Sequence, residues 1–148
     1  MGSLIFFCLL GAAQDRNPLP DSAAVKDAEK QVRAAFKEEY AKKGVADVVA
    51  LARRLLAQAG EAGIELPVRF VLLRDARDLG TQTGDLETAF KAIDGLGATF
   101  DLDRLAAKTA ILTKAAASAK STDTALPVAL GYAQVMEECI ASGLFDTG

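Results

Sequence analysis

The chain has 148 residues, a net charge of −3 and no histidine; 51% of its residues are hydrophobic and only 6% are aromatic. This length corresponds to about one domain, and a hydrophobic fraction led by alanine favours packed helices over β-sheets. The acidic balance argues against a nucleic-acid binder. The absence of histidine removes the usual general base and the commonest metal ligand, so we expect no enzyme, no metal and no cofactor.

The first thirteen residues have the pattern of a signal peptide. Their apolar run LIFFCLLGAA (4–13) is too short to span a bilayer, which takes about 20 residues. Gly11 and Ala13 would provide the small residues for cleavage before Gln14. We therefore expect a signal peptide over 1–13, an exported (periplasmic or extracellular) protein, and no stable membrane insertion after cleavage. A positively charged start is missing, and if the segment is instead a buried part of the fold, the protein is cytoplasmic.

Residues 14–20 (QDRNPLP) contain two prolines and indicate an extended linker. After it, apolar residues recur every three or four positions and predict about six helices. We expect these helices over about 21–43, 47–59, 67–79, 85–96, 101–116 and 126–140. Asp101 is expected to cap the fifth. Pro127 is expected in the first turn of the sixth, whose inward face would carry Leu126, Leu130, Met136 and Ile140.

Six amphipathic helices joined by short loops predict an all-α fold of antiparallel hairpins, because each helix must bury its apolar face against a neighbour. Stacked hairpins of this kind form an α-solenoid. The expected domain covers 21–148. Its last residues, GLFDTG (143–148), look like the start of another turn without a following helix. We therefore expect the last hairpin to be incomplete, or the chain to be truncated at its C-terminus.

The stretch RDLGTQTGDLETAFKAIDGL (77–96) resembles the turn and second helix of a tetratricopeptide repeat. That family places Gly-Asp-hydrophobic at the turn and a small residue five positions after the glycine. Here these are Gly84, Asp85, Leu86 and Ala89. The whole chain also resembles the N-terminal helical region of large exported bacterial proteins of unknown function. The resemblance implies a helical scaffold that binds other proteins.

Four basic residues are the candidates for partner binding: Arg69, Arg74, Arg77 and Lys91. They would hold a protein or an acidic peptide on the concave side of the middle hairpins. Because acidic residues alternate with these arginines, an ordinary solvated face with ion pairs within the helix remains open. The first hypothesis is a non-enzymatic scaffold for protein–protein interaction. The alternative is a structural spacer for a missing C-terminal domain, and an enzyme is a distant third.

Overall fold

The computed structural model describes residues 16–143, so the expected signal peptide (1–13) and almost all of the closing turn (143–148) lie outside the described residues. Within this range the chain forms seven helices and no strand, which confirms the all-α prediction. The helices are α1 (Ser22–Ala35), α2 (Lys37–Ala41), α3 (Val45–Ala59), α4 (Leu66–Thr83), α5 (Leu86–Thr99), α6 (Arg104–Ser118) and α7 (Thr122–Ala141).

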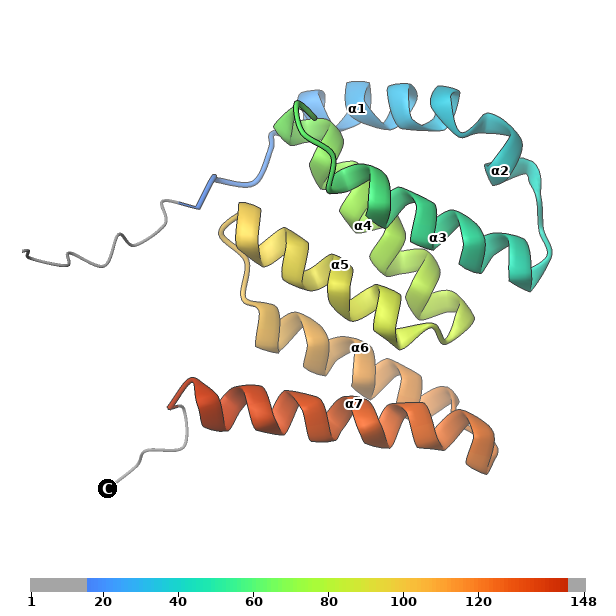
Figure 1. Ribbon diagram of the computed structural model, residues 1–148, viewed down its shortest axis with the longest axis vertical. Coiled ribbons are helices and arrows are strands. Elements are labelled where there is room, and N and C mark those ends of the chain that lie inside the picture. The colour runs from blue at the N-terminus through green and yellow to red at the C-terminus, as the bar shows by residue number, and fades with distance from the viewer. Residues whose placement is uncertain (1–15, 144–148) are drawn as a thin grey trace, which may run out of the picture.

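The helices stack along the molecule, with α1 at one end and α7 at the other (Figure 1). The first part is centred on α4, against which α1, α3 and α5 all pack. In the second part α6 and α7 pack on each other, and both contact α5. Helix α5 is therefore the element that both parts share.

The first helix expected from the sequence is divided in two by a bend at Phe36. This residue leaves the helical region (φ −113°, ψ 27°), although its N–H still bonds to Val32 and its carbonyl still accepts from Tyr40. The bend carries the Phe36 ring into the core, where the Arg54 guanidinium lies 5.3 Å from the ring centre. Helical periodicity continues across the bend, which is why the sequence pattern did not reveal it.

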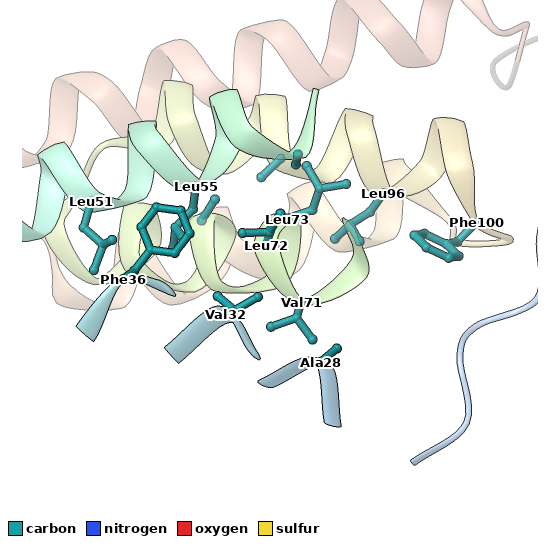
Figure 2. Close-up of a cluster of buried hydrophobic side chains, with 13 residues drawn as sticks. Ala28, Val32, Phe36, Leu51, Leu55, Val71, Leu72, Leu73, Leu96 and Phe100 are labelled. Carbon is teal, nitrogen blue, oxygen red and sulfur yellow. The ribbon is translucent and has the colours of Figure 1, made fainter. Parts of the chain in front are cut away.

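The larger hydrophobic core lies between α1, α3, α4 and α5. Figure 2 shows Ala28, Val32 and Phe36 on one side of it, opposite the side chains from α3 and α4. The rings of Phe70 and Phe100, the latter at the end of α5, are nearly perpendicular, with 5.5 Å between ring centres. The buried residues of this larger core are Ala28, Val32, Phe36, Leu51, Leu55, Ala59, Val71, Leu72, Leu73, Ala76, Ala92, Leu96 and Phe100.

A smaller core joins α5 to the α6–α7 pair and contains Leu86, Phe90, Leu112, Val128 and Val135. Here the helices approach closely because α7 has a glycine at the contact. A Cβ atom on Gly131 would lie 2.5 Å from a methyl group of Leu112 and 3.3 Å from the Phe90 ring. A side chain at this position would therefore push α7 away from its neighbours.

The turn between α4 and α5 has the conformation expected from its sequence. Gly84 adopts a left-handed conformation (φ 77°) that ends α4. Asp85 caps α5 by accepting a hydrogen bond from the Thr88 N–H. A Cβ on Gly80 would lie 3.0 Å from the Ala89 backbone nitrogen. This glycine therefore lets the last turn of α4 lie close against the first turn of α5.

Helices α6 and α7 begin differently from the expectation. Asp103, rather than Asp101, caps α6 through the Ala106 N–H. Ser121 caps α7 through a reciprocal pair of hydrogen bonds with Thr124. Pro127 is therefore the sixth residue of α7, inside the helix and not in its first turn. The serine–threonine capping box starts the helix earlier than the proline alone indicated.

The face of α7 expected to point inward is exposed. Leu126, Leu130, Met136 and Ile140 all lie at the surface, while Val128, Gly131 and Val135 form the buried face. The glycine allows the close contact with Leu112 described above, so the buried face is the one with the smaller side chains. The inward face predicted for this helix was wrong.

The described part of the expected linker is tied to the rest of the fold. The Asn17 N–H donates to the carbonyl of Thr99, and the Asp101 N–H donates to the carbonyl of Asn17. The Asn17 side-chain amide adds a third hydrogen bond to Thr99. These bonds fasten the chain before α1 to the connection between α5 and α6. They form an isolated β-bridge between Asn17 and Phe100.

Candidate functional site

The four basic residues singled out from the sequence do not gather at one place. The Lys91 ammonium bonds to Glu87 one turn earlier on the exposed face of α5. Arg69 donates from Nη2 to the Glu61 carbonyl at 3.0 Å, next to the loop before α4. Arg74 and Arg77 are on α4, but they have different surroundings.

Arg74 belongs to a polar network that holds α1 and α2 against α4. Its guanidinium bonds to Glu29 of α1 and to the neighbouring Asp75, each at 2.8 Å. Asp75 in turn accepts a hydrogen bond from the Tyr40 hydroxyl at 2.6 Å. Burial, together with this bond and the charge of Asp75, raises the pKa of Tyr40 above its usual range. Arg74 therefore already has two carboxylate partners within the protein.

Arg77 lies about one turn further along α4, where it borders a groove of about 1030 Å³. The groove runs between the C-terminal half of α4, the start of α5, α6 and the first turns of α7. Alternate helices pack on one side of the stack, α3 on α5 and α5 on α7. On the opposite side α4 and α6 face each other across the groove. Of the four candidates, Arg77 is the one that the structure places in a concave surface.

The groove combines an apolar floor with polar walls. Leu86, Ile111 and Val128 provide apolar surface, and several hydroxyl and amide side chains surround it. The polar lining consists of Thr81, Gln82, Thr83, Ser118 and Thr124. A concave surface with an apolar base and a few convergent polar groups is the usual form of a ligand-binding site.

Two positive side chains (Arg77 and Lys114) and two negative ones (Asp78 and Asp123) line the groove, and only one of the two cations is paired. Arg77 bonds through Nε and Nη2 to Asp78, the next residue along α4. Lys114 of α6 is exposed in the groove wall, and within residues 16–143 its ammonium group makes no ion pair. Asp123 lies at the start of α7. The Lys114 ammonium is therefore the cation in this groove that is available to an acidic ligand.

Lys114 was not recognised in the sequence, although a signal was present. Helix α6 carries a second stripe of mostly small residues beside its core-facing one, at Ala107, Ala110, Ile111, Lys114, Ala115 and Ser118. All six line the groove. Small residues at helical spacing leave room beside a helix, and a lysine among them marks the open side.

No protein-family model, curated protein sequence or solved structure matches this chain. The function must therefore be argued from the residues themselves. In the part of the chain that the structure describes, no group of three or more His, Cys, Asp or Glu residues could hold a metal ion. None of the helices over 16–143 is both long and apolar enough to cross a bilayer.

A second feature missed in the sequence is a buried ion-pair centre below the groove. The Lys108 side chain has no solvent exposure, and its ammonium lies 2.8 Å from Asp94 of α5 and 2.8 Å from Glu138 of α7. It also lies 5.3 Å from the centre of the Phe90 ring. Lys108 stands between Leu105 and Leu112 on the core stripe of α6. A charge at such a register was the available signal for a buried ion pair.

This centre joins all three helices of the second part of the molecule. Burial alone would raise the pKa of Glu138, but hydrogen bonds from Lys108 and Gln134 outweigh this effect and lower it. Glu138 therefore stays ionised down to a lower pH than an ordinary glutamate. The ion pairs fix the angle between α5, α6 and α7, and with it one wall of the groove.

Proposed function

We propose that this protein is a non-enzymatic helical scaffold that binds an extended acidic peptide in the groove between α4 and α6. The groove itself carries the proposal: it is open, has an apolar base, and is lined by the unpaired Lys114 and by Arg77. A backbone lying in it would meet the hydroxyl and amide side chains of its walls. An acidic side chain of the peptide would pair with Lys114, and Arg77 would add positive charge nearby.

The arrangement of the helices supports a likeness to tetratricopeptide repeats. Successive helices pack in pairs, and alternate helices touch on one side of the stack. The Gly84–Asp85 turn and the close approach of Gly80 to Ala89 are what the repeat-like motif requires. We therefore propose a short, solenoid-like stack in which the groove is the binding surface.

The groove favours a binding scaffold over a structural spacer, since a spacer needs no concave surface. The proposal of a non-enzymatic protein rests on the sequence, which has no histidine to act as a general base at neutral pH. If the N-terminal segment is a signal peptide, the scaffold works outside the cytoplasm.

A peptide library displayed on phage tests this proposal. We expect selection on the full chain to enrich extended peptides containing Asp and Glu. Their affinity, measured by fluorescence anisotropy, should weaken as salt is added, because exposed charge pairs are screened. Lys114→Glu and Arg77→Glu should each weaken binding about tenfold, as expected for the loss of roughly 1.4 kcal/mol.

Lys91→Glu is the matched control. It makes the same reversal of charge on an exposed residue of α5 that does not line the groove. Its affinity for the selected peptides should equal that of the unmodified chain. Selection without acidic enrichment, or equal weakening by Lys91→Glu and Lys114→Glu, would contradict the proposed groove site.

A further inference from the structure

The groove between α4 and α6 holds one uncompensated charge of each sign. Arg77 and Asp78 bond to each other on α4, which leaves Lys114 of α6 and Asp123 of α7. Both residues are exposed, and within residues 16–143 neither makes an ion pair. An entirely acidic ligand attracted by Lys114 would therefore also meet the negative charge of Asp123.

Asp123 is not needed to begin α7. The helix is capped by Ser121 and Thr124, whose side chains each accept a hydrogen bond from the backbone N–H of the other. A carboxylate in the first turn also interacts favourably with the helix dipole. That interaction leaves the exposed Asp123 carboxylate accessible to a cation of a ligand.

Lys114 and Asp123 stand at different levels along the groove. Helices α6 and α7 form an antiparallel hairpin (Figure 1). Lys114 is four residues before the end of α6, and Asp123 is the second residue of α7. At about 1.5 Å per residue, their backbones are offset by roughly 5 Å along the helices. Residues i and i+2 of an extended peptide point to the same side and are about 7 Å apart, so the flexible lysine side chain allows one peptide to meet both charges.

The depth of the lining indicates which residue type fits between these two. Lys114 and Asp123 are exposed, whereas Leu86 and Val128 at the base of the groove are buried. Side chains of an extended peptide alternate in direction. When the charged residues point toward Lys114 and Asp123, the residue between them points toward the base, where an apolar side chain is favoured.

We propose that the peptide bound in this groove carries an acidic and a basic residue on either side of an apolar one. The acidic residue pairs with Lys114 and the basic residue with Asp123. This inference rests on the proposed function, because it assigns a charge pattern to the peptide proposed there. An entirely acidic segment would place a second carboxylate near Asp123, and like charges in contact are destabilising. The partner is thus a protein segment of mixed charge.

Fluorescence anisotropy with two labelled, end-blocked, serine-rich peptides tests this pattern. One peptide contains Asp-Val-Lys and the other contains Asp-Val-Asp. We expect the full chain to bind the mixed peptide roughly tenfold more tightly, since the acidic peptide replaces an attraction to Asp123 by a repulsion. Asp123→Lys should reverse the preference, because Lys114 and the new lysine then both favour acidic residues.

Glu137→Lys is the matched control. It makes the same reversal of charge on an exposed residue of α7 that does not line the groove, and it should retain the preference for the mixed peptide. Asp123→Asn, which removes the charge at nearly constant size, should bring the two peptides to similar affinities. Circular dichroism checks that each variant remains helical. An unchanged preference in Asp123→Asn would overturn the inference.

The failure of this inference can be distinguished from the failure of the proposed function. If the full chain binds both peptides equally and Lys114→Glu weakens both, the groove takes acidic peptides but the mixed pattern is wrong. If Lys114→Glu weakens neither peptide, or if neither peptide binds, the groove site and the mixed pattern are both wrong.

Discussion

Lys108 and its two carboxylates form the most buried ionic contact of the described chain. Asp94 and Glu138 keep part of their surface in water, while the lysine side chain has none. An ammonium buried in this way is tolerated because α5 and α7 each provide an opposite charge, and α5 also provides the face of the Phe90 ring. The residue therefore specifies how α5, α6 and α7 come together.

This centre should make the stability of the protein depend on pH. The folded pKa of Glu138 is lowered, so its contribution is complete above the ordinary glutamate pKa and is lost as the pH falls through the folded value. We expect Glu138→Gln to reduce the free energy of unfolding at pH 7 by about 1–2 kcal/mol, allowing for the part-exposed carboxylate. Urea denaturation followed by circular dichroism measures this difference.

As the pH falls through the lowered folded pKa of Glu138, the two proteins should become similar in stability, because Glu138 is then protonated. Glu87→Gln is a suitable control, since it removes a carboxylate whose pKa is also lowered, but by an exposed pair with Lys91. The control should change stability by less than Glu138→Gln does at pH 7. A difference between Glu138→Gln and the parent chain that does not shrink as the pH is lowered from 7 until the parent chain unfolds would rule out this account.

Single residues show where prediction from sequence succeeded and where it failed. The roles of Gly84 and Asp85 were predictable because a turn and a cap depend on local chemistry. The different surroundings of Arg74 and Arg77 were not. Three positions apart on one helix, one contacts Glu29 and the other borders the groove. Which side of α4 meets α1 is a tertiary property that alternating charges do not encode.

Among the elements, α7 has a proline within its helical body. Pro127 has no N–H to donate to the carbonyl of residue 123, four positions earlier, and its ring crowds that turn. We expect Pro127→Ala to raise the free energy of unfolding by about 1–3 kcal/mol, less than a fully unfavourable interior proline because the site is near the helix start. Thermal denaturation should show the increase as a higher Tm.

The matched control is Thr122→Pro, which places a proline at the first residue of the same helix, where the N–H has no partner within the helix. It should destabilise the chain only slightly. If Pro127→Ala instead lowers Tm, the proline's contacts in the groove wall outweigh its cost to the helix.

Helix α7 also shows a limit of hydrophobic periodicity. It is apolar on two faces, one with Leu126 and Ile140 and the other with Val128 and Val135. Periodicity finds the helix but does not choose between such faces. The choice is made by packing, since the face with Gly131 can approach Leu112 and Phe90 most closely.

At the scale of the whole molecule, the two cores are unequal. The core of α1, α3, α4 and α5 contains thirteen buried residues, and the core that holds α6 and α7 contains five. Less buried apolar surface gives a lower free energy of local opening. We expect the backbone amides of α6 and α7 to exchange with deuterium faster than those of α3 and α4, measured by mass spectrometry on peptides at low protein concentration. Equal protection of all helices at low concentration would show that the molecule opens as one cooperative unit.

The groove is the feature that the sequence could least reveal. It exists because α4 and α6 diverge while α3, α5 and α7 stay in contact on the other side. The ion pairs of Lys108 and the contact at Gly131 hold α5, α6 and α7 together, and they come from residues far apart in the chain. The all-α class could be predicted from local patterns, but not the space between helices.

The hydrogen bonds of Asn17 have a mechanical consequence. They join the chain ahead of α1 to Asp101, just before α6, and so close α1–α5 into a loop. A pulling force applied at Arg16 would be transmitted to α6 and α7 directly through these hydrogen bonds, without first stretching the larger core. The five helices inside the loop carry no tension until the hydrogen bonds of Asn17 break.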